Sequence, residues 1–176
     1  ITTTTYEDIE DGWVRLSCTY NATASSAMDV TAAVSFTDAA GTAYVDDLQL
    51  ERNSVASPYN LLVNGSFGMG MKKWTDYSRV QIVNTVQHDG TSGNVLKVTG
   101  GPTYESFAAQ SFSVNLPGSE TYILSGWGKA NSMPNVGASE ASFQLTAKIN
   151  YTDGTSEYAT TPFSYLVFGE WQYLCT

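Results

Sequence analysis

Alternation of apolar and polar residues is the sequence feature that most constrains the fold of this chain. Between Asp29 and Phe36, the apolar residues Val30, Ala32, Val34 and Phe36 fall at every second position. Side chains of a β-strand point to opposite faces in turn, so this pattern predicts half-buried strands. No segment of ten or more residues keeps the 3.6-residue period of an amphipathic helix. The other segments with a strand-like pattern are Trp13–Tyr20, Thr42–Leu50, Arg79–Val86, Asn94–Thr99, Ser106–Leu116, Thr121–Ala130, Ala141–Tyr151, Ser156–Phe168 and the residues from Trp171 onward.

Turn-forming residues separate these segments, as at Asp89-Gly90, Pro117-Gly118 and Asp153-Gly154. Glycine accepts the positive φ that many tight turns need, and proline presets the first turn dihedral. About ten short strands with turns between them indicate an antiparallel β-sandwich. The predicted fold class is therefore all-β, a sandwich of the jelly-roll kind, and a chain of 176 residues is long enough to bury its core.

The charge balance excludes some classes of partner. Eight basic residues stand against seventeen acidic ones, which gives a net charge of −9. Binding to nucleic acid, or to an anionic membrane surface, depends on clustered Lys and Arg, so neither partner is expected. No apolar run approaches the roughly 20 residues that cross a bilayer, so membrane insertion is not expected either. The chain begins at Ile1 instead of Met, which suggests an internal part of a longer protein, and any secretion signal would lie upstream.

A short internal repeat bears on the domain organisation. Asp11–Cys18 resembles Phe168–Cys175: each has a glycine, then a tryptophan that opens an alternating strand. Trp13 and Trp171 are separated by about the length of one sandwich domain. If the match is more than chance, the chain begins late in one module and ends at the same point of the next.

The segment Asn64-Gly65-Ser66-Phe67, followed by Trp74, resembles the opening of jelly-roll carbohydrate-binding modules with a galactose-binding-like sandwich. The closing strand of such modules resembles Tyr44–Glu51, which here lies before the opening segment. This order is similar to tandem modules in wall-associated bacterial proteins with RHS or YD repeats. Further matches to such modules, in the expected order, are Val95–Val98, Gln110–Gly118, Thr121–Trp127, Ile149–Thr155 and Trp171–Tyr173.

The reversed order predicts how the chain is divided. Residues 1–50 would carry the closing strands of one module, residues 51–60 a linker, and residues 61–176 the opening strands of the next. Neither part is a complete sandwich, so we expect them to form one sandwich in circularly permuted order, in a monomer or a strand-swapped dimer. The strands that begin at Trp13 and Trp171 would then compete for a single position.

The sequence favours binding over catalysis. The one histidine, His88, precedes a turn and is expected in solvent, and no serine lies in a Gly-x-Ser-x-Gly motif. The acidic run Glu7–Asp11 is contiguous, so it predicts an acidic loop, whereas glycoside hydrolysis needs two carboxyl groups that face each other across a cleft. Cys18 and Cys175 offer one disulfide, although we interpret them as two unpaired thiols.

The resemblance implies a structural calcium ion, since many such modules hold one with an aspartate of the closing pair. Asp46 and Asp47 match that pair. Asp46 shares strand parity with Leu48 and Leu50, so it is expected to point inward, where an unpaired carboxylate is costly. Such modules often have Glu after the Phe of the opening segment, but this chain has Gly68, which lacks that carboxylate.

The resemblance also implies a polysaccharide or other glycan as ligand, bound by stacking on aromatic rings. The predicted ligand-binding residues are Trp74, Tyr77 and Tyr104, which lie near turn-forming residues, and Trp127, which lies on the half-exposed face of its strand. The expected function is a non-catalytic carbohydrate-binding module of a secreted or cell-surface bacterial protein. The alternative is a structural spacer or protein-interaction module with no sugar ligand.

Overall fold

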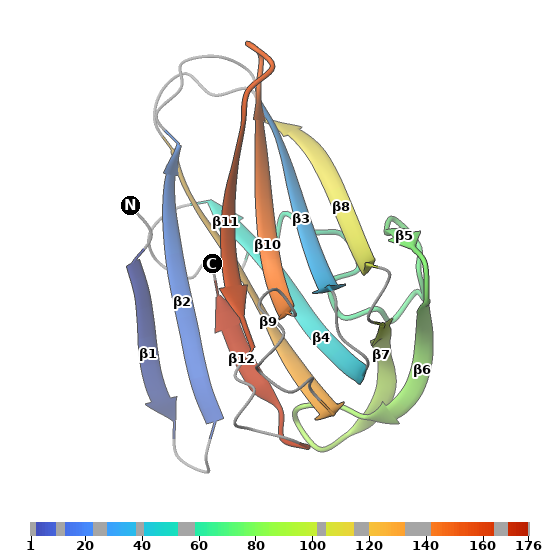
Figure 1. Ribbon diagram of the computed structural model, residues 1–176. Helices are drawn as coiled ribbons and strands as arrows, with labels where there is room; N and C mark the ends of the chain where they lie inside the picture. Colours follow the sequence, from blue (N-terminus) through green and yellow to red (C-terminus); the bar gives the residue numbers. More distant parts are fainter. Residues whose placement is uncertain are drawn as a thin grey trace.

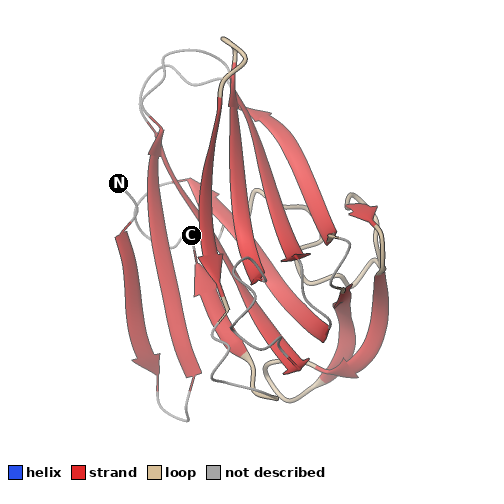
Figure 2. Cartoon of the chain, viewed as in Figure 1, coloured by secondary structure: helices blue, strands red, loops and turns tan. Residues whose placement is uncertain are grey.

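The computed structural model describes residues 3–9, 13–22, 28–37, 41–52, 59–101, 105–114, 120–132, 142–163 and 169–175. These residues form two antiparallel β-sheets and contain no helix (Figure 2), so the predicted all-β sandwich is confirmed. Within the same described ranges, no helix has the length and apolar character needed to span a membrane.

The larger sheet has seven strands (Figure 1). Neighbouring strands within it are antiparallel, and β12 pairs with β9 beside the main order. In spatial order the strands are β1 (Thr3–Ile9), β2 (Trp13–Ala22), β9 (Glu120–Ser132), β4 (Gly41–Arg52), β7 (Ser92–Gly100) and β6 (Val80–Val86), with β12 (Gln172–Cys175) on β9.

The smaller sheet has five strands and faces the first. In spatial order these are β11 (Ser156–Pro162), β10 (Ser142–Tyr151), β3 (Met28–Thr37), β8 (Ser106–Val114) and β5 (Thr75–Tyr77). Two strands were not predicted, β1 and β5. Glu7, Asp8 and Ile9 belong to β1 and pair with Arg15, Val14 and Trp13 of β2, so this part of the acidic run is a strand and not a loop.

The core lies between the two sheets and follows the alternation in the sequence. Its largest fully buried side chains come from both layers: Phe143 and Leu145 from β10 of the smaller sheet, and Leu50 of β4 and Leu96 of β7 from the larger sheet. Phe143 also stacks on Phe163, with ring centroids 4.1 Å apart. Apolar residues at alternate positions therefore build one core, as the period of two requires.

The opening segment is attached to β4 by the side chain of Asn60. Its Oδ1 accepts hydrogen bonds from the backbone N–H of Leu50 (3.0 Å) and of Leu62 (2.9 Å), while its Nδ2 donates to the carbonyl of Leu48 (2.8 Å). The N–H of Leu48 donates to the carbonyl of Gly65. Asn60 thus replaces a missing strand partner at the end of β4, although it was predicted to be the last residue of a linker. Residues 53–58 of that linker lie outside the described residues.

The strands that begin near Trp13 and Trp171 share one edge of β9. Residues 20–22 of β2 pair with 122–120 at the start of β9, and β12 pairs with residues 128–125 further along. β2 and β12 thus divide this edge of β9 between them instead of competing for a single position. β3 and β4 lie inside their sheets, each between two strands from later in the chain. The assignment of residues 1–50 and 61–176 to two modules, and strand exchange between chains, stay predictions.

Candidate functional site

The candidate site lies on the outer face of the seven-stranded sheet, where β9 carries Trp127 and Lys129. The residues between and beside them, Gly126, Gly128 and Ala130, are buried toward the core. A Cβ on Gly126 would meet Leu48, and one on Gly128 would meet the ring of Phe163. Because the inner face of β9 accepts only small residues at these positions, the alternation leaves Trp127 and Lys129 on the outer face, half-buried.

A β-bulge in β4 brings two aspartates to the same face. The register of β4 on β9 shifts between Asp46 and Gln49, and Asp47 has a positive φ of 46°. Val45 and Leu48 both belong to the core, so the bulge reverses the parity of the strand between them. Asp46 pairs with Trp127 across the strands. It therefore does not share a face with Leu48 and Leu50, and the predicted inward orientation is wrong because the sequence does not reveal the bulge.

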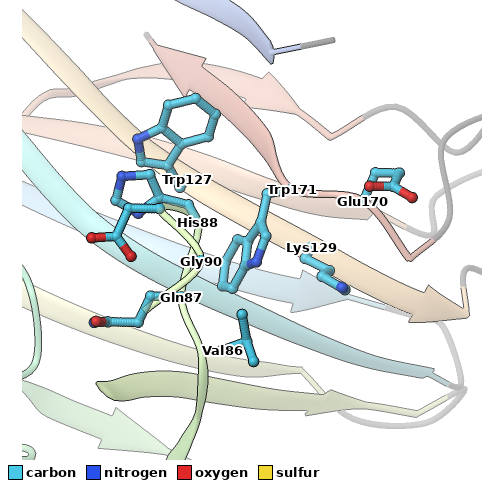
Figure 3. Close-up of a pocket in the computed structure, with 9 residues that line it drawn as sticks. Val86, Gln87, His88, Gly90, Trp127, Lys129, Glu170 and Trp171 are labelled. Carbon is cyan, nitrogen blue, oxygen red and sulfur yellow. The ribbon is translucent and has the colours of Figure 1, made fainter. Parts of the chain in front are cut away.

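The turn between β6 and β7 folds over this face and brings His88 to the aspartates. The Nδ1 of His88 lies 3.4 Å from Oδ2 of Asp46, and its Nε2 lies 3.7 Å from Oδ2 of Asp47. The imidazole stacks on the indole of Trp127, with centroids 4.8 Å apart and planes inclined by 10° (Figure 3). The side chain of His88 is only 19% exposed. The expectation of a solvated histidine is thus wrong, because the turn lies against the sheet.

Local hydrogen bonds hold this turn. The N–H of Gln87 donates to the carbonyl of Thr91 (2.7 Å), and Oδ1 of Asp89 accepts from the N–H (2.8 Å) and from the hydroxyl (2.7 Å) of Thr91. These bonds from Thr91 lower the pKa of the Asp89 carboxyl. Gly90 takes a φ of 81°, which glycine adopts without strain. The predicted Asp89-Gly90 turn is therefore present, and it fixes the backbone position of His88.

A hollow of about 570 Å³ opens beside this turn. In Figure 3, Trp171 lies between Trp127 and Lys129, and Glu170 lies beyond Trp171, on the side away from His88. The residues that line the hollow are Val86, Gln87, His88, Asp89, Gly90, Trp127, Lys129, Glu170 and Trp171. Of these, only Trp127 was predicted as a ligand residue. Lys129 could also have been predicted, because it shares strand parity with Trp127. No local pattern, however, places the β6–β7 turn or Trp171 at this hollow.

The charges in the cluster influence one another. Burial by itself would lower the pKa of His88, but its hydrogen bond to Asp46 and the charges of Asp47, Asp46 and Asp89 outweigh that effect and raise the pKa. Burial raises the pKa of the Asp47 carboxyl, and the nearby Asp46 charge adds to the rise, although His88 opposes it. The protonated imidazole is therefore the form that these carboxylates favour.

The other predicted ligand residues do not join Trp127. Trp74 is buried: its ring packs on Phe67 with centroids 5.2 Å apart, and its Nε1 donates to the carbonyl of Asn64 (3.0 Å). This burial leaves almost no ring surface for a sugar. Tyr77 is exposed but lies on β5 of the other sheet, where it stacks on Phe107 with centroids 5.2 Å apart. Tyr104 lies outside the described residues, as do the side chains of Cys18 and Cys175.

The donor set around Asp46 fits calcium poorly. The possible ligand atoms of Asp46, Asp47 and His88 all lie within 4.8 Å of one another. Calcium takes six to eight oxygen ligands. Here an imidazole faces one Asp46 oxygen, the N–H of Asp47 donates to the other (3.0 Å), and Gly68 contributes no carboxylate.

Comparison with known families identifies the family to which the chain belongs. Residues 59–175 match the family model described as a carbohydrate binding domain, and the chain belongs to that family. No curated protein and no solved structure matches the chain significantly. The family match begins after β3 and β4 and includes the β6–β7 turn, β9 and Trp171, which together form the hollow.

Proposed function

We propose that this chain is a non-catalytic module of an extracellular protein and that it binds a glycan in the hollow between Trp127 and Trp171. The observation that carries the proposal is an outward-facing tryptophan in a hollow that polar side chains also line, in a chain of the carbohydrate-binding family. Its volume of about 570 Å³ lies within the range of small-ligand sites, about 300–1,000 Å³.

The lining residues suggest how a sugar would bind. An indole ring offers an apolar surface against which the C–H face of a sugar ring can stack, as aromatic rings do at many binding surfaces. Lys129 and Glu170 provide a donor and an acceptor for hydroxyl groups at the edge of the hollow. Asp89 and Glu170 at the hollow, and the net charge of −9, disfavour anionic sugars. The proposed ligand class is therefore a neutral glycan.

The contacts of the carboxylates near the hollow support binding without hydrolysis. Asp89 caps its own turn through Thr91, and Asp46 and Asp47 lie against His88. A glycosidase needs two carboxyl groups on either side of the scissile bond, about 5–10 Å apart, one of them free to transfer a proton. The composition, rich in neutral polar residues, is typical of exported β-proteins and supports an extracellular location.

A glycan-array screen of the chain, followed by calorimetry with the best neutral ligand, tests the proposal. We expect Trp127→Ala to weaken binding at least about tenfold, a loss of ~1.4 kcal/mol. Tyr158→Ala is the matched control, because Tyr158 is an exposed aromatic residue (62%) on β11 of the other sheet. If Trp127→Ala bound normally while Tyr77→Ala lost affinity, the site would lie on the five-stranded sheet. If the array showed no neutral ligand, the proposed function would be refuted.

A further inference from the structure

We propose that His88 is a positioning residue: anchored by the buried carboxylate of Asp46, it fixes the indole of Trp127 and the wall of the hollow that the β6–β7 turn forms. The effect on glycan affinity rests on the proposed function. The effect on the ring of Trp127 does not, because it is a property of the protein without ligand.

The first step is the burial of Asp46, whose exposed fraction is 0%. A buried carboxylate is costly unless hydrogen bonds or opposite charge compensate for it. Its Oδ1 receives the N–H of Asp47 at 3.0 Å, and its Oδ2 faces Nδ1 of His88 at 3.4 Å. The imidazole therefore has a defined position, beside Asp46. It also supplies a hydrogen-bond partner for the carboxylate that was predicted to help hold a calcium ion.

The second step is the connection from the imidazole to the turn. His88 lies between Gln87 and Asp89, and both of these neighbours are bonded to Thr91 across the turn. Nε2 of Gln87 donates to the carbonyl of Asn94 (3.3 Å) on β7. The backbone around His88 is thus tied to β7, so a ring held at Asp46 keeps the whole turn against the outer face of the sheet.

The third step is the stack between the imidazole and the indole. Their planes are inclined by only 10°, and their centroids are 4.8 Å apart, so His88 covers one face of Trp127. A sugar can then reach only the ring surface that His88 leaves uncovered. The charged groups around His88 are Asp46 and Asp47 of β4 and Asp89 of its own turn, and Lys129 of β9 lines the same hollow. The Nδ1–H tautomer and the protonated ring can both donate to Asp46, so the proposal does not depend on titration.

The test follows the indole N–H resonance of Trp127 without ligand, assigned with the Trp127→Phe variant. We expect His88→Ala to move this resonance, because the stacked ring and its anchor are lost, and to weaken binding of the neutral glycan about tenfold. Asp46→Asn should move the same resonance, and the double variant should add little to either single change, since the residues act in series. His88→Asn, whose amide can still donate to Asp46, should restore part of the affinity.

The outcomes separate the two proposals. An unchanged Trp127 resonance in folded His88→Ala would overturn the positioning role, whatever the ligand results. A shifted resonance in a chain that binds no glycan would retain the positioning role and refute the proposed function. If His88→Ala does not fold, the Trp127 resonance and the glycan affinity are compared in His88→Asn and Asp46→Asn instead. A wild-type Trp127 resonance that moved on addition of a chelator and returned with calcium would assign the anchor to calcium and overturn the role of His88.

Discussion

Trp74 and Trp127 lie in different environments, although both were predicted to bind ligand. Trp74 is 6% exposed, packs on Phe67 and belongs to the core, whereas Trp127 lies on the outer face of β9 and lines the hollow. The two predictions used different reasoning. Trp127 was selected by its parity in a strand, and Trp74 by its proximity to turn-forming residues. The difference shows that parity in a regular strand predicts which face a ring occupies, and that turn residues nearby do not.

The opening segment shows why proximity fails. Asn64, Phe67 and Lys73 adopt positive φ, as does Gly70. Oδ1 of Asn64 accepts the N–H of Met69 (2.9 Å), and its Nδ2 donates to the carbonyls of Gly70 and Lys72. Left-handed residues at these positions curl the chain, so a segment with the composition of a surface loop directs Phe67 inward and brings Trp74 onto it. Outside glycine, such conformations are uncommon, and composition does not reveal them.

The largest expected effect separates the two tryptophans by stability. Trp74→Ala should lower the free energy of unfolding by about 3–5 kcal/mol, because it leaves a cavity next to Phe67 and removes the bond to Asn64. Trp127→Ala, on the outer face, should lower it by less than about 2 kcal/mol. Urea denaturation of both variants, followed by circular dichroism, measures the difference. Equal losses would mean that Trp127 also supports the core.

The fold was more predictable than the site, for physical reasons visible at single residues. Alternation alone predicted segments that match β2, β3, β4 and most later strands, because one face of each is buried. It did not predict the orientation of Asp46, since a bulge reverses parity without any signature in the sequence. It did not predict the position of His88 against the sheet, because the position of its turn depends on which strands are neighbours in the sheet. The contact between Asp46 and His88 joins residues that are distant in the sequence. A local sequence pattern does not predict such contacts.

An intermediate effect is expected at Asn60, which joins the opening segment to β4. Asn60→Ala would leave the N–H groups of Leu50 and Leu62 and the carbonyl of Leu48 without this partner, at a cost of about 1–3 kcal/mol. Asn84→Ala is the control, because Asn84 is exposed on β6. The affinity of folded Asn60→Ala for a neutral glycan should stay at the wild-type value, because Asn60 does not line the hollow. A parallel loss of affinity would show that the opening segment and the hollow are coupled.

The smallest expected effect is a dependence on pH that is confined to the hollow. The folded state raises the pKa of His88 above its ordinary value of 6.5: burial opposes the rise, but the bond to Asp46 and the charges of Asp47, Asp46 and Asp89 outweigh it. A raised pKa means that the folded state holds this proton more tightly than the unfolded chain does. The resulting stabilisation is complete below pH 6.5 and is lost as the pH rises through the folded pKa. Over that window the melting temperature of the wild type should fall by about 1–2 °C relative to His88→Gln, which does not titrate there.

The Trp127 resonance should titrate over the same window, while that of Trp74, bonded to the carbonyl of Asn64 in the core, should stay constant. If both resonances titrated together, the protonation of His88 would act on the whole sandwich, and the contrast between the two tryptophans would not extend to their electrostatics.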